Sequence, residues 1–440
     1  MGITNGVVVS NSQSVGNEAV FESAAVEDVN SAYDVNAQKV VIAYTDTGNS
    51  NYGTAVVGTV SGTSISFGTP VVFEAAHSLN NSIVYDANAQ KVIISYRDVG
   101  NSVYGTSIVG TVSGTNISFG SPVVFETSHA RYISSTFDSN SNKVVVVYAP
   151  DGNSSYGTAR VGTVSGTNIS FGTAVVFNTA STGSYLAATF DSNSNKVVLA
   201  YRDAGNSSYG TAIVGTVSGT GISFGSEAVF NAVNSTWIAT TFDSSSNKVV
   251  IAYSVGGSGD AGTVKVGTVS GTSISFGTAV VFETDATSYT SATFDSNSNK
   301  VVITYSDAGN SYYGTVISGT VSDTSISFNT KLVFNAGNTD FTSSVFDSTS
   351  NKVVIGYRDD GNSSYGTSVI YSGASIIRGS TASGSTAIIQ AGGAVNTLQT
   401  GLTPGQQYFV QTDGTLGLTA DDPSVIAGTA VSATDLIVKG

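Results

Sequence analysis

The sequence predicts an all-β protein, a seven-bladed β-propeller of four-stranded blades followed by a small C-terminal β domain. Three observations predict this fold. An aromatic–aspartate pair recurs every 52 or 53 residues through most of the 440-residue chain. Each repeat contains four strand-like segments, joined by short linkers rich in the turn residues Asn, Gly, Ser and Asp. The last repeat lacks its fourth segment, and a matching segment stands near the N-terminus.

The repeat period is nearly constant, which indicates a rigid structural unit. Four-stranded units of about 40 to 50 residues are the signature of propeller blades. The aromatic–aspartate pairs that mark the seven units are Tyr33–Asp34, Tyr85–Asp86, Phe137–Asp138, Phe190–Asp191, Phe242–Asp243, Phe294–Asp295 and Phe346–Asp347.

The second unit shows the four predicted strands in order. Residues 81–86 (NSIVYD) form the first and carry small side chains. Residues 91–98 (KVIISYRD) are a continuous apolar run, as expected for a strand covered on both faces. The third and fourth strands are predicted at 105–114 (GTSIVGTVSG) and 116–126 (NISFGSPVVFE).

The loop after the second strand has the glycine spacing of a phosphate-binding loop. Its form in the fourth unit is YRDAGNSSYGT, residues 201–211, and five near-copies occur in other units. No copy has the lysine that such loops use to meet phosphate. We therefore interpret the loop as a hairpin connection that belongs to the repeat.

The two ends of the array predict how the ring closes. The seventh unit stops after its third strand, and residues 14–22 (SVGNEAVFE) align with the fourth strand of the other units. We expect this N-terminal strand to complete the last blade, which hides two sheet edges prone to aggregation. The predicted domains are therefore 1–372, the propeller, and 373–440, the small β domain.

Composition excludes several classes of function. The net charge is −14 with only 16 Lys and Arg, so the basic surface of a nucleic-acid binder is absent. The chain has no cysteine, which excludes disulfides and thiolate-bound zinc. The opening lacks the basic start and apolar stretch of a secretory signal, and no apolar run approaches the roughly 20 residues of a membrane helix. We expect a soluble chain with no cofactor and no membrane insertion.

The candidate site lies on the blade face whose loops vary most between units. The position six residues before each marker aspartate is aromatic in five of the seven units. On this topology these rings surround the mouth of the central funnel, where aromatic faces beside hydroxyls and amides suit a sugar ring. The candidate glycan-binding residues are Tyr132, Tyr185, Trp237, Tyr289 and Phe341, together with Arg131 beside the first of them.

Other interpretations of these residues stay open. The rings could instead wedge between blades and cap the core, the commoner role of aromatic residues. Asp138, Asn140 and Asn142 have the alternate spacing that begins a calcium loop, but the central glycine and distal glutamate are missing, so we expect Asx-turns and no metal. The pattern D-x-G-N-S-x-Y distantly resembles the Asp-box of sialidase propellers. Without an evident cluster of three arginines, we expect no enzyme activity.

The last 40 residues carry a further resemblance. The segments LTPG-x-x-YFV and AGTAVSAT-x-L-x-VKG resemble the ends of tail-fibre and related virion proteins of tailed bacteriophages, notably marine and cyanobacterial ones. The resemblance implies an extracellular virion appendage, often trimeric, whose propeller binds a host-surface glycan or docks another virion protein. The alternative is a secreted or surface adhesin of a bacterium, exported without a signal peptide.

Overall fold

The computed structural model describes residues 8–10, 13–257, 259–373, 376–378, 395–396, 402–411, 416–419, 425–430 and 436–438. It divides into two compact units, Val15–Ser372 and a second made of Met1–Ser14 with Gly373–Gly440. The only helices in the described residues are 3₁₀ turns of three residues each, and none of them could span a bilayer. Within its described residues the larger unit is thus an all-β repeat fold.

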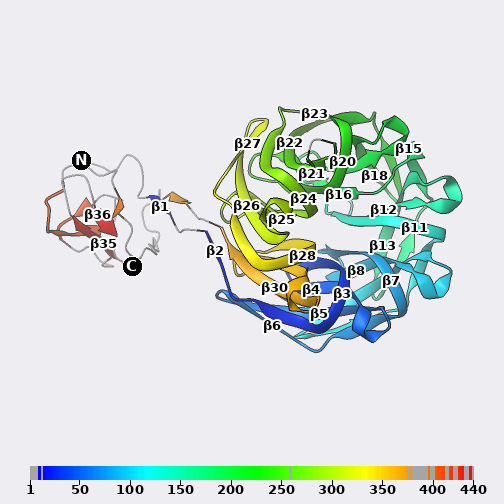
Figure 1. The fold of residues 1–440 in the computed structure, drawn as a ribbon, viewed down its shortest axis with the longest axis horizontal. Coiled ribbons are helices and arrows are strands. Elements are labelled where there is room, and N and C mark those ends of the chain that lie inside the picture. The colour runs from blue at the N-terminus through cyan, green and yellow to red at the C-terminus, as the bar shows by residue number, and fades with distance from the viewer. Residues whose placement is uncertain are drawn as a thin grey trace. The chain divides into compact units, whose positions relative to one another are not determined.

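One repeat illustrates the strand order, and Figure 1 shows the array that the repeats build. In the second repeat, β7 (Val71–Asp86) pairs with β8 (Lys91–Asp98), β8 pairs with β9 (Tyr104–Ser113), and β9 pairs with β10 (Asn116–Phe119), all antiparallel. The next strand, β11 (Val123–Asp138), pairs with β9 through its first half and with β12 (Lys143–Pro150) through its second half.

The sequence predicted two separate strands here, the end of the fourth strand of one repeat and the first strand of the next repeat. In the structure, both belong to one long strand. The sequence predicted a loop between them, whereas the structure has a bulged strand that leaves one sheet and enters its neighbour. The other crossing strands are β3 (Ala19–Asp34), β20 (Ala228–Asp243), β24 (Val280–Asp295) and β28 (Leu332–Asp347), with β15 (Val175–Ser181) and β16 (Leu186–Asp191) as an interrupted version.

The remaining strands repeat the same pattern. The second strands are β4 (Lys39–Asp46), β8, β12, β17 (Lys196–Asp203), β21 (Lys248–Val255), β25 (Lys300–Asp307) and β29 (Lys352–Asp359). The third strands are β5 (Tyr52–Ser61), β9, β13 (Tyr156–Ser165), β18 (Tyr209–Ser218), β22 (Ala261–Ser270), β26 (Tyr313–Ser322) and β30 (Tyr365–Ser372). Short outer strands are β2 (Ser14–Val15), β6 (Ser64–Phe67), β10, β14 (Asn168–Phe171), β19 (Gly221–Phe224), β23 (Ser273–Phe276) and β27 (Ser325–Phe328).

The predicted hairpin loop YRDAGNSSYGT folds as a 3₁₀ turn followed by a left-handed serine. In the fourth repeat the turn is η4 (Ala204–Asn206), and the Asp203 side chain accepts a hydrogen bond from the Gly205 N–H. The equivalent turns are η1 (Thr47–Asn49), η2 (Val99–Asn101), η3 (Asp151–Asn153), η5 (Ala308–Asn310) and η6 (Asp360–Asn362). The aspartates of the first, second and fourth repeats thus accept from turn backbone, whereas Asp307 pairs with Lys331 and Asp359 accepts from Asn335 Nδ2.

The hydrophobic core lies between neighbouring repeats. Each second strand is almost fully buried, as the continuous apolar runs predicted, and its tyrosine packs on a phenylalanine from the crossing strand. Phe73 and Tyr96, for example, have ring centroids 5.2 Å apart, and the Tyr96 hydroxyl donates to Glu74 Oε2 over 2.9 Å. The core cluster around these rings combines residues of the first repeat, such as Val57, with Ile94 of the second. Burial of this kind contributes about 25 cal/mol per Å² of apolar surface.

A glycine in the outer strand lets each repeat approach the next. At six of these positions, an added Cβ would lie 1.9–2.0 Å from a threonine carbonyl oxygen in the following repeat. The glycines are Gly16, Gly68, Gly120, Gly172, Gly225 and Gly277, and they face Thr63, Thr115, Thr167, Thr220, Thr272 and Thr324. Asn329 occupies the seventh equivalent position.

The two ends of the array pair with each other. In β3, Ala19 is opposite Ser368 of β30 and Glu22 is opposite Gly366, and the Gly16 N–H donates to the Ile370 carbonyl over 2.8 Å. Figure 1 shows these blue and orange strands side by side. The number of blades and the closure of the ring stay predictions at this point.

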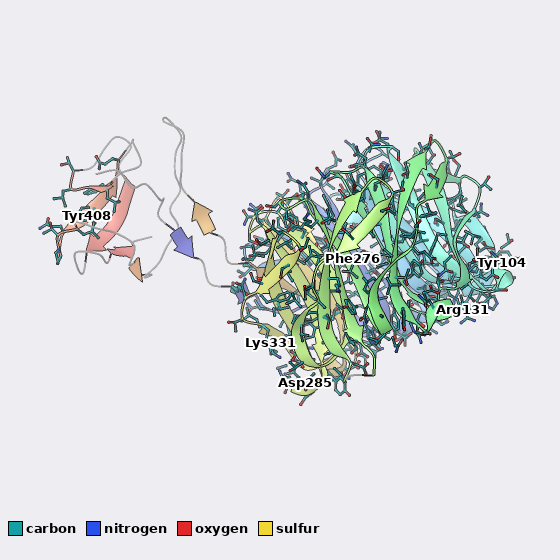
Figure 2. The ribbon with its side chains drawn as sticks, turned by 90° about the horizontal axis from the view of Figure 1, so that it is seen from above. Tyr104, Arg131, Phe276, Asp285, Lys331 and Tyr408 are labelled. Atoms are coloured by element: carbon teal, nitrogen blue, oxygen red, sulfur yellow. The ribbon has the colours of Figure 1, made fainter. Side chains whose placement is uncertain are left out.

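The smaller unit also consists of strands in its described residues. A five-stranded sheet has the order β32 (Val395–Asn396), β36 (Leu436–Val438), β35 (Val425–Ala430), β33 (Gln407–Val410) and β34 (Leu416–Gly417). Tyr408 of β33, labelled in Figure 2, is buried and its hydroxyl accepts from the Thr403 N–H over 2.8 Å. A separate two-stranded sheet pairs β1 (Val8–Ser10) with β31 (Ile376–Arg378). Parts of the predicted domain 373–440, and of its two fibre-like segments, lie outside the described residues.

Candidate functional site

Seven equivalent residues, called the rim here, occupy the bulge of the crossing strands. Each has a positive φ, between 49° and 70°, at the point where the strand register shifts or the strand is interrupted. The rim residues in chain order are Asp28, Asn80, Tyr132, Tyr185, Trp237, Tyr289 and Phe341. The sequence placed five of them as candidate ligand-binding residues, and the structure brings all five together at the rim.

The backbone of the rim is strained where the residues are aromatic. A positive φ is routine for Gly and tolerated by Asn and Asp, but it is a genuine outlier for a bulky side chain. The left-handed conformation costs about 1–2 kcal/mol per residue. Only Asp28 and Asn80 are of a tolerant type, whereas Tyr132, Tyr185 and Trp237 are not. Strain of this kind clusters at functional positions, which makes the rim a candidate site.

Four of the aromatic rim residues form a continuous ladder. The ring centroids of Tyr185 and Trp237 are 4.9 Å apart, those of Trp237 and Tyr289 are 4.4 Å apart, and those of Tyr289 and Phe341 are 5.0 Å apart. All of these rings are half-buried. Tyr132, Tyr185 and Phe341 also pack against the core clusters between repeats, so the rim supplies both a wedge and a partly exposed aromatic surface.

The two rim residues with polar side chains, Asp28 and Asn80, form a polar arc. Asp28 Oδ2 accepts a hydrogen bond from the Asn80 N–H over 2.7 Å, and Asn80 Oδ1 accepts from the Tyr132 N–H over 3.2 Å. Each side chain therefore satisfies the strained backbone of the next rim position. Burial raises the pKa of Asp28 to about 6, although the bond from Asn80 and the nearby Arg97 oppose the shift.

Five of the seven rim residues line a cavity of about 370 Å³, namely Asp28, Asn80, Tyr132, Tyr185 and Trp237, whereas Tyr289 and Phe341 do not. The rest of the lining combines apolar side chains with small, amide and hydroxyl side chains. Three wall atoms are buried without a hydrogen-bond partner, namely Asn81 Oδ1, Thr240 Oγ1 and Thr290 Oγ1. Buried polar atoms are normally bonded, so these three atoms lack the partner that most buried polar groups have.

Arg131, the sixth predicted site residue, does not line the cavity. Its Nε and Nη2 atoms donate to the two carboxylate oxygens of Asp151 over 2.7 Å each, and His129 Nδ1 lies 3.2 Å from the same carboxylate. The bidentate pair raises the pKa of Arg131 and lowers that of Asp151. Figure 2 shows Arg131 of β11 toward the lower side of the array, as it does Asp285 of β24.

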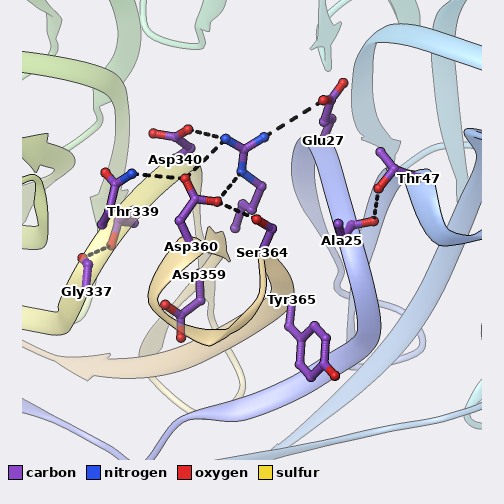
Figure 3. A network of polar contacts seen from close by, with 12 residues as sticks. Ala25, Glu27, Thr47, Gly337, Thr339, Asp340, Asp359, Asp360, Ser364 and Tyr365 are labelled. Carbon is purple, nitrogen blue, oxygen red and sulfur yellow. Dashed lines mark hydrogen bonds and ion pairs between the residues drawn. The ribbon is translucent and has the colours of Figure 1, made fainter.

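Sequence reasoning missed a second group of arginines near the rim. Arg358 lies over the Phe341 ring, 4.8 Å from its centroid, and pairs with Asp340, Asp360 and Glu27 (Figure 3). Arg97 and Arg202 stand at the same repeat position in other units. The tripeptide Tyr-Arg-Asp recurs in three units and could have indicated these arginines. It was interpreted only as part of the hairpin loop.

The described residues contain no group of three or more His, Cys, Asp or Glu side chains placed to hold a metal ion. At the proposed calcium turn, Asp138 Oδ1 accepts from the N–H groups of Asn140 and Ser141 over 2.9 and 3.0 Å. The aspartate therefore serves the Asx-turn expected from the sequence.

Comparisons with known proteins identify the class of fold. A scan against protein-family models gives no match, and a search of the curated proteins also gives none. Among solved structures, a lectin from Burkholderia pseudomallei aligns with a TM-score of 0.60 and 9% identity, over 81% of this chain and 100% of that one. The chain therefore has a β-propeller repeat fold of the kind found in this lectin.

Two further solved structures align less closely. A protein of unknown function from Dyadobacter fermentans has a TM-score of 0.49 and 11% identity, covering 83% of this chain and 99% of its own. An Aleuria aurantia lectin mutant, solved in complex with Fucalpha1-6GlcNAc, has a TM-score of 0.46 and 13% identity, covering 70% and 96%. Nothing in these comparisons links the chain to a tail fibre or a virion.

Proposed function

We propose that the chain is a non-enzymatic carbohydrate-binding protein that holds a glycan at the aromatic rim. The observation that carries this proposal is the set of strained aromatic residues around a cavity with unsatisfied polar atoms. Sugar rings have apolar C–H faces and polar edges, so they match aromatic rings beside hydroxyl and amide groups. The lectin of like fold from Burkholderia pseudomallei agrees with a carbohydrate ligand.

The proposal includes a closed ring of seven blades. Two contacts support closure, namely the pairing of β3 with β30 and the approach of Gly16 to Thr63. Asn329 supports it as well. This residue precedes the seventh unit, whose outer strand comes from the N-terminal segment, so that unit has no outer hairpin turn for a glycine to approach. The one position without glycine is thus the one where the closed ring does not require it.

The location of the protein is a separate proposal. The resemblance of the last 40 residues to fibre ends supports a trimeric virion appendage that touches a host surface. The alternative is an adhesin secreted by, or attached to, a bacterium. Flanking capsid and tail genes would favour the virion, and flanking export genes would favour the adhesin.

The test of glycan binding uses Trp237 and Tyr289, the two central rings of the ladder, which the core clusters do not include. We expect Trp237→Ala with Tyr289→Ala to weaken glycan binding more than tenfold, because each aromatic stack contributes about 0.5–1.5 kcal/mol beyond its buried area. Glycan-array screening followed by calorimetric titration measures the loss. The matched control is Tyr312→Ala, which removes an aromatic ring that is 53% exposed and is not a rim residue.

Two outcomes would contradict the proposal. A large fall in melting temperature with unchanged binding would show that the rings serve packing only. Release of reducing sugar from a bound glycan by the unmodified protein would show that the site is hydrolytic.

A further inference from the structure

Three repeats place an arginine beside the rim at the same position of the second strand. Arg97, Arg202 and Arg358 each follow a buried tyrosine. Leu79 is opposite Arg97 and Asp340 is opposite Arg358, and each of these partners directly precedes a rim residue. The Arg202 N–H donates to the carbonyl oxygen of Tyr185, which is itself a rim residue. The three guanidinium groups can therefore be compared as equivalent members of one set.

Arg358 is neutralised within the protein. It pairs with Asp340 in its own repeat, its Nε lies 2.8 Å from Asp360 Oδ1, and its Nη1 lies 3.9 Å from Glu27 Oε1 of the first repeat. Figure 3 shows these three carboxylates around the guanidinium group. Three acids facing one arginine leave this sector of the rim acidic.

The counter-ions of Arg358 are missing around the other two arginines. The residues equivalent to Asp340, Asp360 and Glu27 are Leu79, Val99 and Arg131 around Arg97, and Ser184, Ala204 and Thr236 around Arg202. None of these six side chains carries a carboxylate. Within residues 13–373, residue 258 apart, neither Arg97 nor Arg202 forms an ion pair.

The hydrogen-bonding capacity of both guanidiniums is also largely unused. Arg97 Nε is buried without a partner, and burial lowers the pKa of Arg97. Arg131 lowers that pKa further, whereas Asp28 and Asp151 raise it. Asp28 Oδ2 already accepts from Asn80, and the Asp151 carboxylate already pairs with Arg131. Arg202 Nε donates over 2.8 Å to Asn234 Oδ1, a neutral amide oxygen. A half-buried guanidinium without a counter-ion is costly and is suited to bind a planar carboxylate by two hydrogen bonds.

We propose that Arg97 and Arg202 bind carboxylate groups, so that the ligand of the rim is an acidic glycan containing uronic or sialic acid. This inference rests on the proposed glycan-binding function and adds the chemical class of the sugar. The two arginines belong to the second and fourth repeats, next to the start of the aromatic arc at Tyr132 and Tyr185. A sugar stacked on the arc would direct its carboxylate toward them and away from the acidic sector around Arg358.

The experiment compares acidic glycans with neutral partners of the same size. The probes are trigalacturonic acid and its carboxyl-reduced form, a hyaluronan tetrasaccharide and its carboxyl-reduced form, and sialyllactose and lactose. We expect the protein to bind at least one acidic member about tenfold or more tightly than its neutral partner, the effect of one charge-assisted hydrogen-bonded pair. Arg97→Gln with Arg202→Gln should remove this preference while neutral binding changes less than twofold.

Two further variants keep the test interpretable. Arg97→Lys with Arg202→Lys retains the charge but not the bidentate geometry, so we expect an intermediate affinity for the acidic probe. Lys39→Gln removes a positive charge at the opposite end of the second strand and should leave the preference unchanged. Melting temperatures within about 3 °C of the unmodified protein verify that the variants fold, since a shift of this size reflects only a few kcal/mol.

The possible results separate the two proposals. Equal binding of acidic and neutral partners leaves glycan binding in place and overturns the carboxylate inference. Failure to bind any member of the three pairs overturns both. A loss in the glutamine variant that is as large for the neutral probe as for the acidic one assigns the arginines a structural role and also overturns the inference.

Discussion

Replacement of Gly120 by alanine tests how tightly adjacent repeats pack. The new Cβ would stand 2.0 Å from the Thr167 carbonyl oxygen, whereas real Cβ atoms essentially never approach within 3.0 Å. The two backbones must therefore separate by at least about 1 Å, and overpacking of this kind costs about 1–3 kcal/mol. We take the upper value because the obstacle is a backbone atom that cannot rotate away.

Part of this loss is offset in the unfolded chain. Alanine has less backbone freedom than glycine, which returns about 0.4–1 kcal/mol and leaves a net loss of about 2 kcal/mol. The entropy of unfolding is about 2.1 cal/mol/K per residue, so a unit of roughly 360 residues loses about 1.3 °C of melting temperature per kcal/mol. A loss of about 2 kcal/mol at about 1.3 °C per kcal/mol lowers the melting temperature of the Gly120→Ala variant by about 3 °C, which a calorimetric scan measures.

The control is Asn329→Ala, which places the same residue at the equivalent position before the seventh repeat. Asn329 Nδ2 donates to Ser318 Oγ over 2.8 Å, and loss of this bond costs about 1 kcal/mol or less. The expected shift is near 1 °C. Equal shifts for the two variants, or no shift for Gly120→Ala, would refute the idea that the glycine is required by the neighbouring repeat.

Two other predictions concern buried ionisable groups. Burial raises the pKa of Asp28 from its ordinary value of 3.8 to about 6. The folded protein therefore binds more protons than the unfolded chain between these values, and it loses stability as the pH rises through them. Asp28→Asn can still accept from the Asn80 N–H, so it should be neutral at pH 3 and stabilise the protein at pH 7 by up to about 3 kcal/mol, measured by denaturant titration at both pH values. Tyr96→Phe leaves Glu74 without its hydroxyl donor and should cost about 1–2 kcal/mol. The control, Tyr253→Phe, should lower the free energy of unfolding by less than half as much, because the Tyr253 hydroxyl has no hydrogen bond within the described residues. Equal losses for the two variants would contradict a stabilising role of the bond from Tyr96 to Glu74.

The regular features of the fold could be predicted because each leaves a repeated trace in the sequence. The buried second strands are continuous apolar runs, and the turn chemistry of Asp138 and its equivalents recurs in every repeat. At one hairpin, Lys300 donates to Thr320 Oγ1, and Asp295 accepts from N–H groups of the turn.

The candidate site was only partly predictable. The spacing of the aromatic residues indicated a shared rim, but a left-handed φ at Trp237 leaves no sign in a sequence, since any loop or strand residue could stand there. The state of each arginine depends on residues from neighbouring repeats. Glu27 contacts Arg358 across more than 300 residues, and the absence of such a partner near Arg97 becomes visible only when the repeats are superposed in space.

The pairing of β3 with β30 has a consequence during protein synthesis. Ala19 leaves the ribosome early, but its partner Ser368 follows about 350 residues later, which takes roughly 20 to 70 s at 5–20 residues per second. Throughout this interval the nascent chain carries an unmatched ribbon at its leading end, open to other nascent chains on the same messenger. A ribosome-associated chaperone that covers this ribbon would raise the yield of correctly assembled molecules.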